Sequence, residues 1–262
     1  MELSKRLQAV ADMVTEGSRV ADIGCDHGYT SIYLCKEKKC PNIIAMDVKK
    51  GPLERAKANI NKYKLSDYIE VRPSDGAEAL RENEADTLLM SGMGGRLTIG
   101  ILERAFQSLG KSFELVLQPQ SEIFLVRAFL REEGIKIVDE TMVLDQGKYY
   151  PVIKAQPQTG KESTTDGNEE SREKSQDSCG AKSRYTQTVR DYFGPVLLNK
   201  RPAVFLDYLK KEKEKTNTLL SQVTKEERRK ELQEYLSYVE TALGNETALD
   251  NEAALIEEAE GC

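Results

Sequence analysis

The stretch Val20-Ala-Asp-Ile-Gly-Cys-Asp-His-Gly-Tyr29 decides the fold that we expect for this chain. Its first four residues are apolar apart from one acid and predict a short buried strand. Gly24 and Gly28 predict a tight turn, and the residues from Tyr29 onward predict a helix. In an open α/β sheet such a strand–turn–helix unit lies at the carboxyl edge, where ligands bind. Both glycines let the backbone come close to a ligand because they carry no Cβ.

The spacing of the two glycines indicates which ligand the turn accepts. It is G-x-x-x-G, not the G-x-G-x-x-G that places a pyrophosphate on a helix N-terminus. Asp22, just before the turn, would repel a phosphate and suits a cationic or hydroxyl-rich ligand. Both features argue against NAD or FAD and favour an S-adenosylmethionine site. A nicotinamide oxidoreductase stays open as an alternative, which binding of NADH would support.

Composition limits the class of protein further. A chain of 262 residues with 39% hydrophobic content can bury an α/β core and a second, smaller unit. The net charge of -6 means that nucleic-acid binding would need a local basic patch. The five cysteines form no C-x-x-C pair, which favours a reduced, cytoplasmic protein with no metal site. No apolar run is long enough to serve as a signal segment or to span a membrane.

Short apolar runs alternate with amphipathic segments over residues 1–156, and the first amphipathic helix has Ser4 as its expected N-cap. The final two strands follow each other directly, which predicts an antiparallel pair at one edge. The fold class expected is therefore α/β, a Rossmann-like class I methyltransferase domain with a seven-stranded, mostly parallel sheet. The runs predict strands at residues 20–23, 42–47, 68–72, 87–90, 113–117, 135–144 and 149–155.

The composition changes after residue 156. Residues 157–183 are polar and predict a linker that is partly disordered. Residues 184–244 predict a C-terminal α-helical hairpin, whose narrow apolar seams are typical of an antiparallel coiled coil. Thr224-Lys-Glu-Glu227 matches the capping box expected at the start of its second helix. Residues 245–262 form an acidic tail that we expect to be frayed.

Acidic and small residues follow the strands at the carboxyl edge. Asp47 ends the second strand, where a carboxylate can bind both ribose hydroxyls of an adenosyl group. Asp75 follows the third strand and can accept from the adenine amino group, while Ser91 follows the fourth, against the methionine part. Each acid alone could be a helix N-cap or a loop residue, but the fold predicts ligand contacts at all of these positions. The predicted cofactor contacts are Asp22, Gly24, Asp47, Val48, Asp75, Gly76, Ser91 and Gly92.

Four motifs carry a more specific signal: Asp-Ile-Gly-Cys-Asp-His-Gly-Tyr, Ser-Asp-Gly-Ala, Ser-Gly-Met-Gly-Gly and Leu-Gln-Pro-Gln. Together they resemble the bacterial tRNA (adenine-22-N1)-methyltransferase family, known as TrmK, over residues 1 to about 156. A helical hairpin after the catalytic domain also matches this family. The resemblance implies transfer of the sulfonium methyl group of S-adenosylmethionine to N1 of an adenine in the D-arm region of tRNA.

This chemistry indicates catalytic residues in the first motif. N1 carries its own lone pair, so the transfer needs alignment more than a strong base. The methylated base is positively charged, and Asp26 is the first candidate to stabilise that charge. The base must be unpaired or flipped, and Tyr29, with Tyr149 or Tyr150, is a candidate to stack on it. His27, the only histidine, either makes a structural hydrogen bond or positions the base or a phosphate without cycling a proton.

Substrate contacts are expected beyond the first motif. Gln118 lies where many base methyltransferases place a polar-Pro motif, and Gly94-Gly95 is either a contact or simply a tight turn. The hairpin carries more basic than acidic residues in its first part, which predicts either an arm that binds tRNA phosphates or a solvated face. The predicted substrate contacts are Met93, Gly94, Gly95, Gln118, Lys210, Lys211 and Arg228.

Two other functions stay open at this point. The methyltransferase could act on another RNA, a protein or a small molecule, although the basic hairpin speaks against a small molecule. The chain could also be a non-catalytic RNA-binding protein that keeps a relic cofactor fold. We expect tRNA as the partner and a monomer as the oligomeric state.

Overall fold

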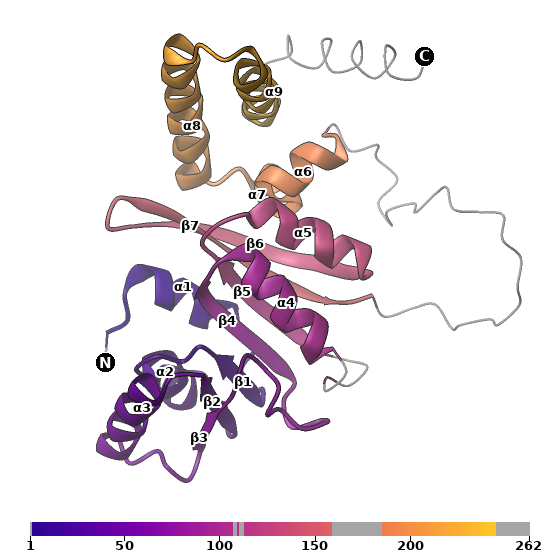
Figure 1. Ribbon diagram of the computed structural model, residues 1–262. Coiled ribbons are helices and arrows are strands. Elements are labelled where there is room, and N and C mark those ends of the chain that lie inside the picture. Colours follow the sequence, from indigo (N-terminus) through magenta and orange to yellow (C-terminus); the bar gives the residue numbers. More distant parts are fainter. Residues whose placement is uncertain (1, 107–108, 110–112, 159–184, 245–262) are drawn as a thin grey trace, which may run out of the picture.

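The computed structural model describes residues 2–106, 109, 113–158 and 185–244. The predicted linker from residue 159 onward and the predicted tail 245–262 lie outside the described residues. A central sheet is covered by helices on both faces, and a helical region lies against one edge of the sheet (Figure 1). No helix in the described ranges is both long enough and apolar enough to cross a membrane.

The described strands form one sheet in the order β3-β2-β1-β4-β5-β7-β6. The pairs among β1 to β5 are parallel, whereas β7 pairs antiparallel with both β5 and β6. The predicted seven-stranded, mostly parallel sheet is confirmed. The strands are β1 (Val20–Ile23), β2 (Ile43–Asp47), β3 (Ile69–Pro73), β4 (Thr87–Met93), β5 (Glu114–Pro119), β6 (Ile135–Asp145) and β7 (Lys148–Pro157).

The fourth strand extends three residues beyond its predicted end at Met90. Ser91 pairs with Gln118 and Met93 pairs with Pro119, with an irregularity between them. Gly92 supplies it, because its φ of +86° is a conformation that residues with a side chain rarely adopt. The Ser-Gly-Met segment is therefore irregular strand, not a loop.

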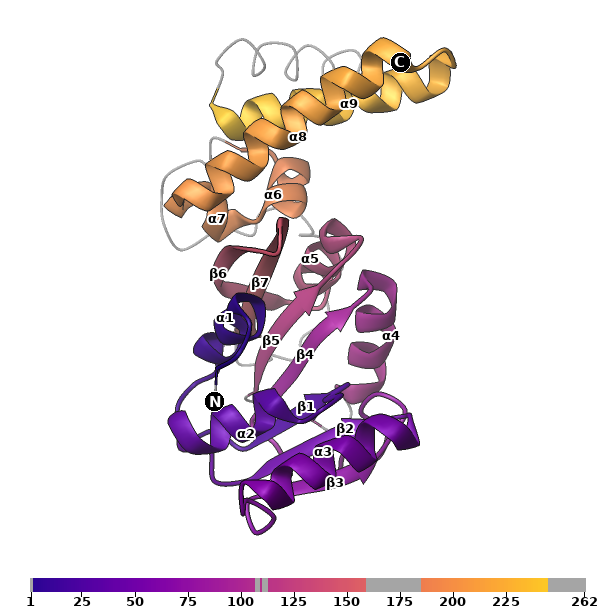
Figure 2. The same ribbon diagram turned by 90° about the vertical axis from the view of Figure 1, so that its left-hand side faces the viewer.

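Helices cover the two faces of the sheet in separate groups (Figure 2). One face carries α1 (Lys5–Met13), α2 (Tyr29–Glu37) and α3 (Lys50–Lys62), and the other carries α4 (Gly95–Ala105) and α5 (Ile123–Glu132). Each group buries an apolar layer against the sheet, which is what the alternating pattern predicts. Ser4 caps α1, its Oγ accepting a hydrogen bond from the Leu7 amide at 3.3 Å, as expected.

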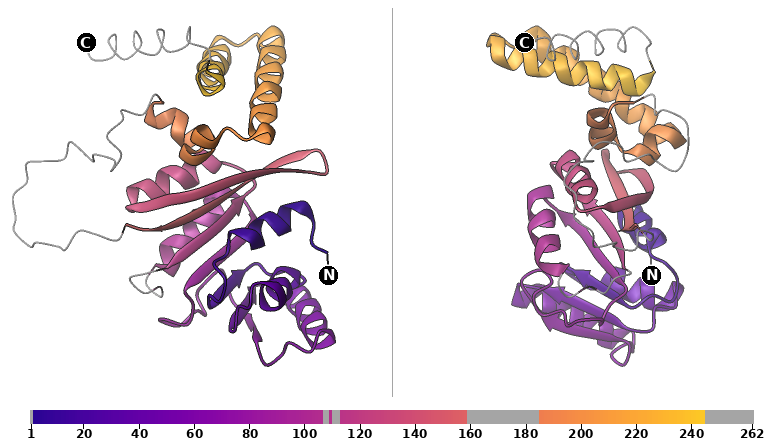
Figure 3. Two further views of the ribbon diagram at one scale, coloured as in Figure 1. Left: turned by 180° about the vertical axis from the view of Figure 1, so that it is seen from behind. Right: turned by 90° about the vertical axis from the view of Figure 1, so that its right-hand side faces the viewer.

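The C-terminal region contains two short helices before the hairpin. They are α6 (Gln187–Phe193) and α7 (Pro195–Lys200), and they pack on α5 and β6. The long helices α8 (Ala203–Gln222) and α9 (Glu226–Leu243) run antiparallel beside each other (Figure 3). The coiled-coil geometry stays a prediction. The capping-box prediction is wrong, because Lys225 occupies the N-cap position and makes no side-chain capping bond.

A buried ion pair joins the helical region to the sheet domain. Arg127 of α5 donates from Nε to Glu140 of β6 at 2.8 Å, and the two side chains are 2% and 0% exposed. The other carboxylate oxygen of Glu140 accepts from the Val196 amide of α7 at 3.0 Å. Arg127 Nη1 also donates to the carbonyls of Asp191 and Tyr192 in α6. One charged pair therefore holds four elements together.

Candidate functional site

The two glycines of the first motif are both required by close packing. The amides of Gly24 and Cys25 donate to the Met46 carbonyl at 2.8 and 2.9 Å, which turns the chain away from β1. Gly24 has a φ of +73°, and a Cβ there would lie 2.4 Å from the terminal methyl group of Met93. Gly28 has a φ of +71°, and a Cβ there would lie 3.2 Å from that of Ala56. Met93, predicted as a substrate contact, therefore covers the glycine turn.

Asp22 lies beneath the same turn as a buried carboxylate. Its side chain accepts a hydrogen bond from the Ser31 hydroxyl at 2.6 Å and has no ion pair with any described cation. Burial raises its pKa to about 6, against the effect of the Ser31 bond and with a further contribution from the charge of Asp47. A buried carboxylate without a cation suits a positively charged ligand at this turn.

Asp47 ends β2 with one carboxylate oxygen still available. Oδ1 accepts from the Lys49 amide at 2.9 Å, and no described residue donates to Oδ2. The neighbouring Val48 is 65% exposed and presents an apolar surface beside it. The Asp47 carbonyl accepts from the Ser74 amide at 3.0 Å, so the ends of β2 and β3 are tied together. An acid and an apolar face here match the ribose and the ring of an adenosyl group.

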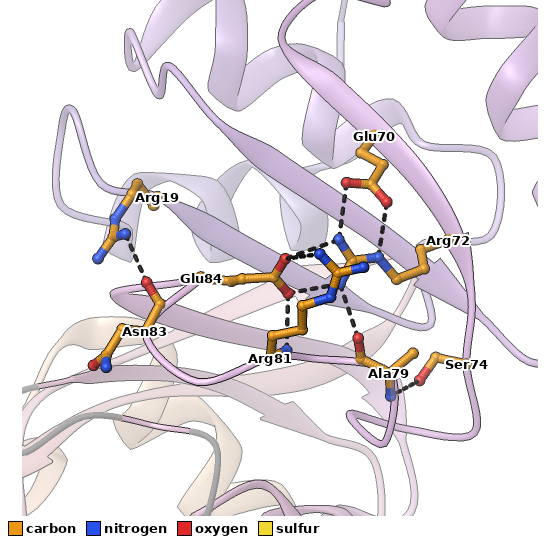
Figure 4. Close-up of polar contacts among 8 residues, drawn as sticks. All are labelled: Arg19, Glu70, Arg72, Ser74, Ala79, Arg81, Asn83 and Glu84. Carbon is orange, nitrogen blue, oxygen red and sulfur yellow. Dashed lines mark hydrogen bonds and ion pairs between the residues drawn. The ribbon is translucent and has the colours of Figure 1, made fainter.

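The loop with Asp75 and Gly76 is held by Arg72, which the sequence analysis missed (Figure 4). Arg72 pairs with Glu70 and Glu84 and donates to the Ala79 carbonyl at 2.8 Å. The hydrogen bond from Arg72 lowers the pKa of Glu84 to about 2. The Ser74 hydroxyl accepts from the Ala79 amide at 3.1 Å and closes the turn. Glu70 and Arg72 share one strand face at a spacing of two, a signal that could have revealed the pair.

Gly76 packs against helix α4. Its φ is +58°, and a Cβ there would lie 2.8 Å from Cγ1 of Ile101. The far end of the same loop is fixed by Arg19, which donates to the Asn83 carbonyl at 2.7 Å (Figure 4). The position of Asp75 at the edge is therefore set by contacts on both sides of the loop.

The three predicted catalytic residues lie together at the start of α2. The rings of His27 and Tyr29 are stacked, with centroids 5.8 Å apart and planes at 11°. Asp26 lies 3.5 Å from Nε2 of His27 and 3.4 Å from Nη2 of Arg55. Asp26 has a left-handed φ of 47°, which aspartate tolerates better than most residues. Tyr29 is 40% exposed, so its ring is available for stacking.

Ser91 and Gln118 meet an arginine that the sequence analysis also missed. Nη1 of Arg6, on α1, donates to Ser91 Oγ at 3.0 Å and to Gln118 Oε1 at 2.8 Å. Gln118 is only 1% exposed, so a ligand that binds at this edge would contact Arg6 and Ser91 rather than Gln118. A Cβ on Gly92 would lie 3.5 Å from the same guanidinium nitrogen. No local sequence pattern connects residue 6 with residues 91 and 118.

Gly94 and Gly95 form a tight strand-to-helix turn. Gly94 is the N-cap residue of α4, and a Cβ on Gly95 would lie 2.6 Å from the Ser121 carbonyl oxygen. The Gly95 amide donates to that carbonyl at 3.0 Å. Both residues thus have a structural reason to be glycine, and a substrate contact for them stays a prediction.

Tyr149 and Tyr150 point to different neighbours because successive strand residues face opposite sides of a sheet. The Tyr149 hydroxyl bonds to Asp207 and to Lys211, both on α8. Tyr150 lies under the guanidinium of Arg6, whose carbon is 5.6 Å from the ring centroid. Of the two candidates, Tyr150 is the one beside the carboxyl edge.

Four basic residues on α8 and α9 pair with nearby acids, namely Lys211, Lys213, Lys215 and Arg228. Lys211 pairs with Asp207, and Arg228 pairs with Glu231 at 2.6 Å. Lys210 has no hydrogen-bond or ion-pair partner within the described part of the chain. The same described part holds no group of three His, Cys, Asp or Glu side chains arranged to bind a metal.

Comparisons with known proteins agree with this geometry. Residues 3–153 match the family model described as a methyltransferase domain. The tRNA (adenine(22)-N(1))-methyltransferase of Bacillus subtilis is 31% identical over 224 residues, which are 86% of this chain and 87% of that protein.

Solved structures also align with most of this chain, and two of those that cover 92% of it are the following. The B. subtilis M1A22 tRNA methyltransferase TrmK has a TM-score of 0.76 at 29% identity, with 99% of its own chain covered. Streptococcus pneumoniae Sp1610, solved in complex with S-adenosyl-L-methionine, has a TM-score of 0.74 at 28% identity, with all of its chain covered. The chain belongs to the methyltransferase-domain family and, within it, to the tRNA (adenine(22)-N(1))-methyltransferases.

Proposed function

We propose that this protein transfers a methyl group from S-adenosylmethionine to N1 of adenine 22 in tRNA. One observation carries the proposal. The glycine turn and the acids Asp22, Asp47 and Asp75 lie at adjacent strand ends, in a chain that is 31% identical to a tRNA (adenine(22)-N(1))-methyltransferase. A substrate outside RNA would not account for that relationship.

The residues at this edge fit S-adenosylmethionine. In this proposal the Asp47 carboxylate accepts from the ribose hydroxyls, and Asp75 accepts from the adenine amino group. The buried negative charge of Asp22, beneath the glycine turn, suits the methionine part, which carries the positive charge. The bound cofactor supplies an electrophilic methyl group, and the protein supplies its orientation.

The β1–α2 turn supports the transfer to the base. The exposed Tyr29 ring offers a stacking face for an unpaired adenine, and His27 holds that ring by stacking on it. N1 attacks with its own lone pair, so no general base is needed before the bond forms. The charge that develops on the purine is stabilised by the Asp26 carboxylate.

The assay that tests the function is methylation of unmodified tRNA followed by nucleoside mass spectrometry. We expect 1-methyladenosine with the wild-type protein and a strong loss with Asp26→Asn, which keeps the left-handed backbone and removes the charge. Glu16→Gln, an exposed acid paired with Lys39, is the control. Binding of S-adenosylmethionine without any methylated nucleoside would refute the tRNA assignment and leave the fold assignment intact.

The helical region is proposed to bind tRNA phosphates. Of the three predicted hairpin contacts, Lys210 has the strongest case because it makes no ion pair with a described residue, whereas Lys211 is held by Asp207 and Tyr149 and Arg228 by Glu231. We expect Lys210→Glu to weaken tRNA binding more than Lys213→Glu, whose parent lysine is paired with Glu240. Equal affinities for the two variants and the wild type would exclude the hairpin as an RNA arm. We also propose that the protein works as a monomer, with domains at residues 1–156 and 184–244.

A further inference from the structure

Arg6 lies at the carboxyl edge of the sheet although it belongs to the first helix. Its backbone amide donates to Asp145 at 3.2 Å, which fixes the start of α1 to the β6–β7 turn. Nη1 is held by Ser91 and Gln118, and the guanidinium lies over the Tyr150 ring. Neutral groups from three strands therefore fix the position of this charge.

The Arg6 guanidinium is half-buried and has no carboxylate partner among the described residues. Within the same ranges Nε and Nη2 donate to no acceptor, so three of its five N–H groups are unused. A partly buried charge without a counter-charge is costly and is normally paired. The guanidinium is held in a fixed position and keeps its Nε and Nη2 donors free, an arrangement that suits an anionic ligand.

The anion at this edge is either the methionine carboxylate of S-adenosylmethionine, expected beside Ser91, or a phosphate of the RNA, and only the first would make cofactor affinity depend on Arg6. Methylation at N1 makes the adenine cationic, so an arginine beside the base would oppose the reaction. The transferred group and the base are therefore poor partners for Arg6. A nucleotide that is turned out of its stack keeps its phosphate next to the base, and a phosphate accepts two parallel bonds from a guanidinium.

We propose that Arg6 binds the phosphate of the nucleotide to be methylated, and that Ser91, Gln118 and Tyr150 position it for that contact. The proposal rests on the proposed tRNA methylation. It assigns to α1 a role in holding the extruded nucleotide, beside the cofactor contacts made by the strand ends.

The first test compares Arg6→Gln with Lys5→Gln in the full-length protein. Lys5 is an exposed residue at the first position of the same helix, so both variants lose one charge there. We expect Arg6→Gln to raise KM for tRNA by about tenfold to a hundredfold, the range for a hydrogen bond to a charged group. Its binding constant should fall less steeply with salt, by about one unit of slope. S-adenosylmethionine affinity should not change, and Lys5→Gln should behave as wild type.

The second test changes the RNA. A ligated tRNA carries one methylphosphonate at the target adenosine, with a 2′-deoxy sugar that protects the linkage, and the 2′-deoxy phosphate serves as the matched control. We expect this neutral phosphate to weaken binding by wild-type protein and by Lys5→Gln, with no further loss for Arg6→Gln. If Arg6→Gln does not fold, Arg6→Lys is used, and a smaller sensitivity to the methylphosphonate is expected.

Equal sensitivity of wild type and variant to the neutral phosphate would overturn the proposal and leave Arg6 as a packing residue. Absence of 1-methyladenosine with wild-type protein would instead overturn the proposed function, so the two failures are distinguishable.

Discussion

Replacing Glu140 by Gln tests whether the buried ion pair attaches the helical region to the sheet domain. The carboxylate receives two donors, Arg127 Nε at 2.8 Å and the Val196 amide at 3.0 Å. A glutamine has one oxygen, so its NH₂ group must face one of these donors. Arg127, which is 2% exposed, would then be a buried cation without an anion.

Breaking a pair of this kind costs ~3–5 kcal/mol of folding free energy. The neighbouring pair Lys200–Asp139 joins the same β6 and α7 but is exposed, with side chains 53% and 41% accessible. Asp139→Asn is therefore the control and should cost less than about 1 kcal/mol. The difference between the two variants isolates the effect of burial.

Urea unfolding followed by circular dichroism measures the loss, and hydrogen exchange of the amides in α6 and α7 locates it. We expect Glu140→Gln to speed exchange in these helices and to raise KM for tRNA, with the affinity for S-adenosylmethionine unchanged. A stability within about 1 kcal/mol of wild type, with normal exchange in α6 and α7, would refute the role of the pair.

Two further predictions concern the cofactor edge. Gly76→Ala should lower the affinity for S-adenosylmethionine by about tenfold, because it strains a φ of +58° and places a Cβ 2.8 Å from Ile101. Gly147→Ala, with a φ of +77° but no neighbour within 4 Å, should leave that affinity unchanged in the same calorimetric titration. The raised pKa of Asp22, about 6 against 3.8, means that the native state binds this proton more tightly than the unfolded state. Wild type should therefore lose about 2 kcal/mol of stability relative to Asp22→Asn as pH rises from about 4 to 6; parallel urea-unfolding profiles over that range would contradict this.

The fold and the cofactor edge could be predicted because they follow from short-range patterns. Each strand is a short apolar run, and each acid of the site follows such a run directly, so strand order is not needed to place them at one edge. Ser4 was identified as a cap because a cap contacts an amide only three residues away. The residues at the carboxyl edge can therefore be predicted from local sequence.

The contacts that fix this edge could not be predicted in the same way. Arg6 meets Ser91 and Gln118 only because α1 packs across distant strands, and the chain between them contains no related spacing. Thr224 is not the cap because α9 begins with Lys225 at the N-cap position, one residue later, and Arg229 donates to the Val223 carbonyl in the connection. Such choices depend on tertiary geometry, which overrides a local motif.

The pair Arg127–Glu140 attaches α6 and α7, at the start of the helical region, to the catalytic domain. If the edge of the sheet and the hairpin both bind RNA as proposed, a substrate must reach both surfaces at the separation that this attachment sets. A short hairpin RNA with the same target adenosine would reach one surface only and lose the gain in effective concentration that the second one provides. Substrate choice would then depend on the folded shape of the RNA as much as on the sequence around the modified base.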